Sequence, residues 1–210
     1  FDSNEGNGVY EVHNPAGNYD SIPTQNFEMN VRNTTVEKNN NQGWYVNPQG
    51  RPQYGNRYAD YMFLNCVFSD NKGAGFYIRD QYYAYYYYGS ESEEEIWFIN
   101  CTFTYNQRGF RQYLDQYAYG DDTEFHFDEC TFQDNDYEAL YTTGYWYSYY
   151  DSGMSYAKRV VYDVENTLLD GYVYLHISGL YDQGGNIKPE ALISIVNCTY
   201  THDEPMYLRI

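Results

Sequence analysis

Acidic residues and one histidine are the side chains of this sequence best suited to acid–base chemistry or cation binding. Residues 93–95 are three glutamates and residues 121–122 are two aspartates. We place both runs in turns between repeats, stacked one repeat apart, where paired carboxylates are able to exchange protons or hold calcium. His126 and Asp128 are two residues apart, which puts them on one face of a strand.

Charge runs in an acidic protein are also typical of solvated turns. We therefore assign no catalytic residue, metal ligand or cofactor, and keep calcium binding by these carboxylates as the alternative. The sequence contains no nucleophile elbow, phosphate-binding loop or metal-binding helix motif. These observations favour an interaction protein over an enzyme.

Three asparagines stand in the acceptor pattern for N-glycosylation: Asn33, Asn100 and Asn197. Strand alternation predicts that Asn100 points outward while Cys101 points inward, so a sugar on Asn100 would reach solvent. The alternative is an outward column of asparagines that form hydrogen bonds with one another along a stack of repeats.

Each of these asparagines belongs to a motif that returns along the chain. Residues 99–106 read INCTFTYN and residues 64–71 read LNCVFSDN, with further copies at 129–135 and 196–203 and weaker ones at 32–39 and 165–171. One slot of the motif is occupied in turn by Thr34, Cys66, Cys101, Cys130, Thr167 and Cys198. A period of about 33 residues indicates one supersecondary unit repeated six times.

Each unit reads as three short strands. In the motif strand, alternation predicts a core face made of Ile99, Cys101 and Phe103, with Leu64 and Val196 at positions equivalent to Ile99. A second strand follows at residues 43–46, 75–78, 109–114 and 139–141, and a third part is rich in tyrosine. The predicted fold class is all-β: a parallel β-helix of about six coils with roughly three strands per coil.

The motif resembles the repeats of right-handed parallel β-helix proteins, the superfamily that includes pectate lyases and many cell-surface β-solenoids. The resemblance covers roughly residues 27–210 and implies a β-helix domain there. Residues 1–26 carry no copy of the motif, so we expect them to form a cap or an inter-subunit arm. Enzymes of the superfamily commonly place acidic groups, often with calcium, outside one sheet. None of their catalytic motifs carries over to this sequence residue by residue.

The slot residues should form a core ladder on successive rungs. Stacked parallel neighbours point their Cβ atoms the same way, which is poor geometry for a disulfide. We therefore predict an interior column of reduced thiols, with one disulfide among Cys66, Cys101 and Cys130 as the alternative. Zinc is not expected at these cysteines, because ligands in a column do not make a tetrahedron and no histidine accompanies them.

Tyrosine is unusually frequent, at 30 of 210 residues. Tyrosine suits surfaces that are half dry and half wet, so the Tyr-rich segments predict a subunit interface or a wall covered by glycan. A stacked ladder that stabilises the solenoid and a sugar-binding platform are the alternatives. The interface candidates are Tyr82, Tyr83, Tyr85, Tyr86, Tyr87, Tyr88, Tyr117, Tyr119, Tyr145, Tyr147, Tyr149 and Tyr150.

The net charge of −18 argues against nucleic acid or an anionic membrane as partner, and no apolar run approaches the roughly 20 residues of a membrane span. The sequence starts at Phe1 without a signal peptide, which is typical of a processed or partial chain. The last unit stops after residues 206–210 without a third segment. We therefore expect an extracellular or cell-surface structural β-solenoid that self-associates head to tail into a filament, with possible glycosylation. The alternative is a carbohydrate-binding or carbohydrate-cleaving β-helix.

Overall fold

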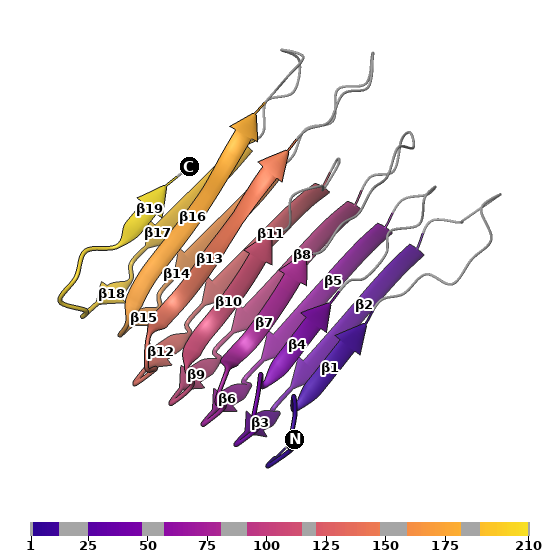
Figure 1. The fold of residues 1–210 in the computed structure, drawn as a ribbon, viewed down its shortest axis with the longest axis vertical. Coiled ribbons are helices and arrows are strands. Elements are labelled where there is room, and N and C mark those ends of the chain that lie inside the picture. Colours follow the sequence, from indigo (N-terminus) through magenta and orange to yellow (C-terminus); the bar gives the residue numbers. More distant parts are fainter. Residues whose placement is uncertain are drawn as a thin grey trace.

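A computed structural model describes residues 2–12, 25–47, 57–80, 92–114, 121–147, 159–181 and 190–209. Within these ranges the chain is all-β, without a helix, and every sheet is parallel (Figure 1). No helix that could cross a membrane occurs in this part of the chain.

The strands form three sheets. The first long sheet contains β2 (Gln25–Arg32), β5 (Arg57–Leu64), β8 (Ser92–Ile99), β11 (Asp121–Asp128), β14 (Arg159–Glu165) and β17 (Glu190–Val196). The short sheet contains β3 (Thr35–Glu37), β6 (Val67–Ser69), β9 (Thr102–Thr104), β12 (Thr131–Gln133), β15 (Leu168–Leu169) and β18 (Thr199–Tyr200). The second long sheet contains β1 (Val9–Val12), β4 (Trp44–Asn47), β7 (Ala74–Asp80), β10 (Arg108–Leu114), β13 (Glu138–Tyr147), β16 (Tyr172–Tyr181) and β19 (Tyr207–Arg209).

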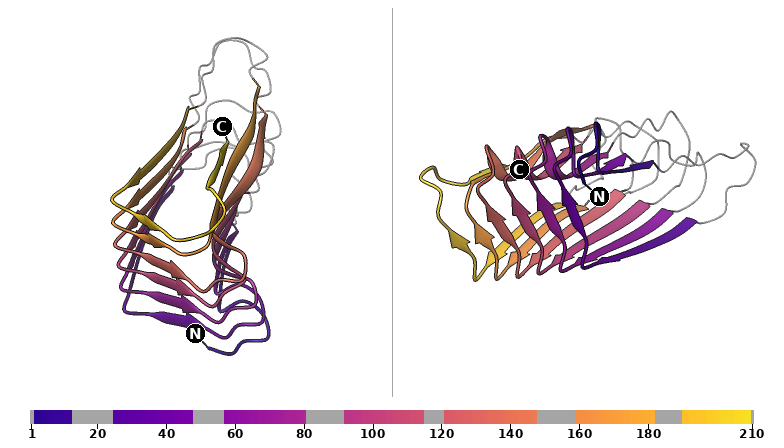
Figure 2. Two further views of the ribbon diagram at one scale, coloured as in Figure 1. Left: turned by 90° about the vertical axis from the view of Figure 1, so that its left-hand side faces the viewer. Right: turned by 90° about the horizontal axis from the view of Figure 1, so that it is seen from below.

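This topology is a parallel β-solenoid. Each strand pairs with the strand three places further along the chain, so every coil visits all three sheets before it stacks on the next. The two long sheets lie on opposite sides of the cross-section, and the short strands join them at one end (Figure 2). The predicted fold class and the three strands per coil are confirmed.

The number of enclosed turns is about four, not the six predicted. Among the described strands, the first and last of the six rungs of the first long sheet have a neighbour on one side only. Their inward side chains, such as Met29 and Ile193, are therefore only partly buried, whereas Tyr61 and Tyr162 in the same column are almost fully buried.

At the corners between the first long sheet and the short sheet, the alternation of inward and outward side chains is interrupted and starts again. Asn65 and Asn100 have φ of 54° and 50°, a left-handed conformation that asparagine tolerates better than most residues. The prediction that Ile99 lies inward with Cys101 is consequently wrong. Phe98 is fully buried while Ile99 is half-buried on the outer side, and the equivalent Leu64 and Val196 are also not core residues.

Phenylalanine columns fill the interior. Phe63, Phe98 and Phe127 stack with ring centroids 5.0 and 5.1 Å apart, and Phe103 and Phe132 stack at 4.5 Å in a second column. Burying each ring contributes about 1.5–3 kcal/mol to folding. The columns keep successive rungs in register, because a one-residue slip would turn each ring to the outer face.

The slot residues lie beside these rings. Cys66, Cys101, Cys130 and Thr167 are at most 2% exposed, and Cys198 and Thr34 at the two ends are half-buried. All four cysteines are free thiols. The Cys101 Sγ lies 3.3 Å from the Phe63 carbonyl oxygen, so each thiol is able to donate a hydrogen bond to the preceding rung.

A ladder of asparagines closes the opposite corner of the short sheet, five residues after each of the first four slot residues; all are buried except the half-buried Asn135. It contains Asn39, Asn71, Asn106 and Asn135. The Asn71 side-chain amide donates to Asn106 Oδ1 at 2.9 Å, and its backbone N–H donates to the same oxygen at 3.1 Å. The ladder satisfies backbone groups that the turn leaves unpaired.

Candidate functional site

The acidic runs lie in strands, not in the turns predicted for them. Glu93, Glu94 and Glu95 belong to β8, and Asp121 and Asp122 begin β11. Strand alternation sends Glu94 inward, where it is 2% exposed, while Glu95 points outward. Three consecutive glutamates have no apolar alternation, which is why the sequence did not indicate a strand there.

Carboxylates form a row on the outer face of the first long sheet. Glu28, Asp60, Glu95 and Glu124 are register partners on four successive rungs. Like charges at this spacing repel one another. Partial burial and the neighbouring charges of Glu95 and Glu28 raise the pKa of Asp60. Because the folded state then holds that proton more tightly than the unfolded state, ionising Asp60 lowers stability as the pH rises above the ordinary range of aspartate.

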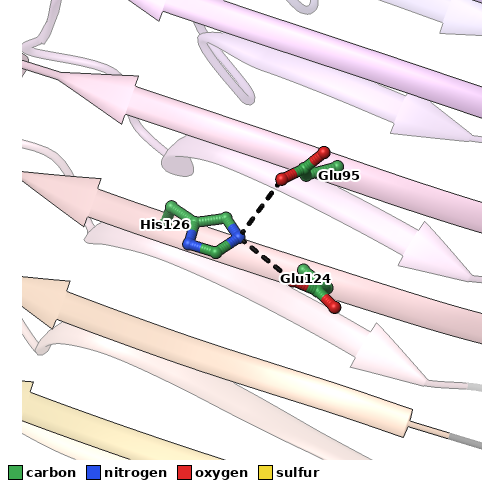
Figure 3. A group of neighbouring side chains, drawn as sticks. All are labelled: Glu95, Glu124 and His126. Carbon is green, nitrogen blue, oxygen red and sulfur yellow. Dashed lines mark ion pairs between the residues drawn. The ribbon is translucent and has the colours of Figure 1, made fainter.

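His126 stands beside the end of this row (Figure 3). Its Nε2 lies 3.3 Å from Glu124 Oε2 and 3.7 Å from Glu95 Oε1. One ligand atom from each of the three residues lies within 4.8 Å of the other two. Glu124 and His126 share a face because they are two apart in β11, and Glu95 joins them because β8 pairs in register with β11.

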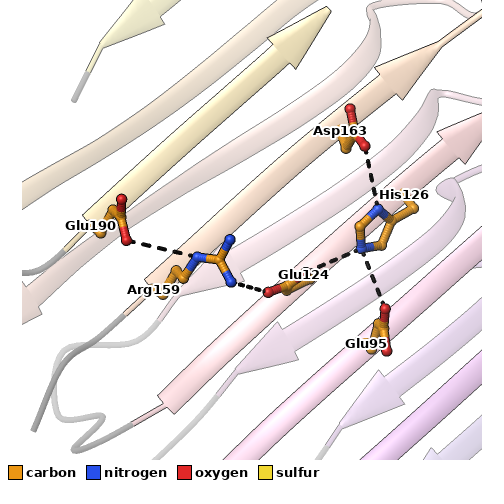
Figure 4. A network of polar contacts seen from close by, with 6 residues as sticks. All are labelled: Glu95, Glu124, His126, Arg159, Asp163 and Glu190. Atoms are coloured by element: carbon orange, nitrogen blue, oxygen red, sulfur yellow. Dashed lines mark hydrogen bonds and ion pairs between the residues drawn. The ribbon is translucent and has the colours of Figure 1, made fainter.

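The histidine ring is held from two further directions. Trp97, its register partner on β8, stacks on the ring at 3.9 Å with an interplanar angle of 8°. On the other ring edge, Nδ1 lies 3.7 Å from Asp163 Oδ2 of β14 (Figure 4). His126 is 9% exposed, and neither ring nitrogen has a hydrogen-bond partner among the described residues.

A cation on the next rung completes the group. The Arg159 guanidinium donates to Glu124 Oε1 and lies 3.8 Å from Glu190, so one oxygen of Glu124 faces Arg159 and the other faces His126 (Figure 4). The cluster can therefore exchange protons between an imidazole and carboxylates, or hold a cation between them.

The sequence indicated several of these residues but not that they lie together. It paired His126 with Asp128, and the two do share a face of β11, but Asp128 accepts a hydrogen bond from Asn166 at 2.9 Å. The two acidic runs were also expected one rung apart, which the register of Glu93 with Asp122 confirms. The approach of Asp163 had no signal in the sequence.

The outer face of the second long sheet has a different character. One register column there contains Tyr10, Tyr45, Tyr77, Arg111, Tyr141, Tyr174 and Tyr207. Tyr45 and Tyr77 stack at 4.9 Å and 6°, and the Arg111 guanidinium carbon lies 4.7 Å from the centroid of the Tyr77 ring. Burial raises the pKa of Tyr77. Neighbouring tyrosines of this column stack face to face, with Arg111 between Tyr77 and Tyr141, so the column is a stacked ladder.

The tyrosines predicted as an interface lie almost entirely outside the described residues. This holds for Tyr82, Tyr83, Tyr85, Tyr86, Tyr87, Tyr88, Tyr117, Tyr119, Tyr149 and Tyr150, and of Tyr145 and Tyr147 only the backbone is described, in β13. What these side chains contact stays a prediction.

The predicted glycosylation sites occupy the left-handed corner. Asn33, Asn100 and Asn197 are exposed, with φ of 50°, 50° and 53°. Asn100 donates its side-chain amide to Asn65 at 2.8 Å, and Asn197 donates to Asn166 at 2.6 Å. The left-handed backbone and the outward column of hydrogen bonds are therefore sufficient reasons for asparagine at these positions. Glycosylation of these residues stays a prediction.

Comparisons with protein-family models, with curated proteins and with solved structures found no match to this chain.

Proposed function

We propose that the protein is an extracellular structural β-solenoid that self-associates head to tail, with glycans on its exposed asparagine corner. The exposed apolar side chains of the last described rung support this proposal. There Leu192, Val196 and Leu208 are 41%, 51% and 47% exposed, and the inward Ile193 and Ile195 are only partly buried. An apolar strand edge of this kind favours pairing with a further rung.

A second copy supplies a suitable rung. At the other end of the solenoid, β2 is an edge strand of the first long sheet and β1 is an edge strand of the second, with Tyr10 54% exposed on β1. Phe27, Met29 and Val31 of β2 are partly buried core residues that would cover Ile193 and Ile195. Joining the last rung to the first is a heterologous contact, which builds open filaments.

Electron microscopy and sedimentation velocity of the purified chain test this proposal. Ile193→Lys places a charge in the joining surface and is expected to give monomers. Ser194→Lys adds the same charge at the neighbouring outward position and is expected to leave filaments intact. A wild-type chain that stays monomeric at high concentration, or filaments that survive Ile193→Lys, would refute head-to-tail assembly.

The carboxylate row favours a second candidate function, binding or cleavage of a carbohydrate. Asp60, with its raised pKa, is suited to donate a proton, and Glu95 on the next rung is suited to act as base or nucleophile. Incubating the chain with neutral and acidic polysaccharides and counting new reducing ends tests cleavage. Unchanged polymer length would rule it out for the polysaccharides used.

A further inference from the structure

We propose that Glu95, Glu124 and His126 form a binding site for a divalent transition-metal ion of the zinc type. The site lies on the outer face of the first long sheet and is independent of the self-association proposed above. Four observations support it: the distances between the ligand atoms, the unsatisfied imidazole, its support by neighbours, and the surrounding charge.

The distances fit a metal shell. Zinc binds imidazole nitrogen and carboxylate oxygen at about 2.0–2.2 Å, so neighbouring ligands of a tetrahedral ion lie about 3.4 Å apart. His126 Nε2 is 3.3 Å from Glu124 Oε2 and 3.7 Å from Glu95 Oε1. Small side-chain rotations of Glu95, whose side chain is 45% exposed, bring the set to bonding distance. A fourth position is left for water or an external ligand.

The imidazole is buried without satisfying its nitrogens. His126 is 9% exposed, and within the part of the chain that the structure describes its Nδ1 and Nε2 have no hydrogen-bond partner, which is costly for a buried polar group. Nε2 points at the two glutamates, as Figure 3 shows. A metal ion on Nε2 would satisfy that lone pair and at the same time neutralise the charge of the glutamates.

The neighbours of the ring support this arrangement. Metal-bound histidines commonly direct the second ring nitrogen at a carboxylate, which fixes the tautomer and raises the basicity of the ligand. Asp163 lies 3.7 Å from Nδ1 and is placed for that role (Figure 4). Trp97 stacks on the ring and fixes its plane. Asp163 is therefore a positioning residue.

The ligand set selects the class of ion. Imidazole suits zinc and its first-row neighbours, whereas calcium and magnesium prefer oxygen ligands alone. The charge of the row also favours a cation, since Glu28, Asp60, Glu95 and Glu124 are register partners on successive rungs. Without a metal, the competing arrangement is a protonated His126 paired with Glu95, Glu124 and Asp163.

Calorimetric titration of the metal-free full chain with zinc chloride tests the site. We expect one zinc ion per chain with a dissociation constant of about 10 μM or lower. Glu95→Gln, Glu124→Gln and His126→Gln should each weaken binding at least roughly tenfold, and Asp163→Asn should weaken it by roughly 10–100-fold. X-ray absorption of the zinc-loaded chain should show one imidazole with oxygen ligands and no sulfur.

Glu28→Gln is the matched control, because it removes one carboxylate of the same row two rungs away from Glu95. It should leave zinc affinity nearly unchanged, and thermal melting confirms that each variant is folded. Absence of zinc binding would support the protonated histidine instead and overturn the proposal. Equal losses in Glu28→Gln and Glu95→Gln, or calcium binding as tight as zinc binding and indifferent to His126→Gln, would also overturn it.

Discussion

Replacing Asn106 by alanine tests whether the buried asparagine ladder holds the solenoid together. Asn106 is fully buried in the middle of the ladder. Its Oδ1 accepts from the Asn71 backbone N–H at 3.1 Å and from the Asn71 side chain at 2.9 Å. Its amide donates to the Phe68 carbonyl oxygen at 2.8 Å and to Asn135 Oδ1 at 3.3 Å. Alanine removes all four bonds.

The magnitude follows from the groups that are left behind. The Asn71 backbone N–H and the Phe68 carbonyl oxygen both lose this partner in the interior. A buried polar group without a partner costs about 1–3 kcal/mol. Because the Asn71 side chain keeps its bond to the Val36 carbonyl, two groups dominate, and we expect the free energy of unfolding to fall by about 2–6 kcal/mol.

Urea unfolding followed by circular dichroism measures this loss, provided that wild type and variant have the same slope. Asn40→Ala is the matched control, since Asn40 is an exposed asparagine beside Asn39 in the same kind of corner. A loss for Asn106→Ala no larger than that for Asn40→Ala would refute the view that the ladder stabilises the fold.

Two further predictions concern the core. Phe98→Ala should lower the free energy of unfolding by about 3–5 kcal/mol, whereas Ile99→Ala should lower it by less than about 1.5 kcal/mol, because only Phe98 is fully buried. Denaturant unfolding of both variants measures these losses. An equal loss for Ile99→Ala would contradict the assignment of Phe98 to the core and Ile99 to the outer face. A hydrogen bond to Cys130 and burial raise the pKa of Cys101 to about 12, so its thiol stays protonated at pH 8. Iodoacetamide at pH 8 should therefore label the half-buried Cys198 in the native chain and spare Cys101, and mass spectrometry that finds Cys101 labelled equally fast would argue against the buried column.

The repeat in the sequence was sufficient to predict the architecture. Recurrence of the Asn-Cys slot at about 33 residues predicted stacked coils, and the second strands were predicted close to where β4, β7, β10 and β13 lie. The burial of Cys66, Cys101 and Cys130 follows from the same pattern. These features depend on local periodicity, which a single sequence displays directly.

The repeat pattern did not predict which residues of each strand point into the core. Strict alternation through Asn100 predicted Ile99 inside, but the left-handed turn at Asn100 ends one strand and restarts the alternation. The Phe98 ring therefore fills the core and Ile99 lies outside. A corner of this kind depends on one backbone dihedral, and asparagine permits that conformation without requiring it.

The sequence by itself determined that this chain is a stack of similar coils with an inward column of cysteine and phenylalanine. Only the tertiary structure decided that Glu95 of one coil meets Glu124 and His126 of the next, with Asp163 one rung further. The physical reason is register. Neighbours within a strand are fixed by the two-residue period, whereas neighbours across rungs depend on how the connections between coils return the chain.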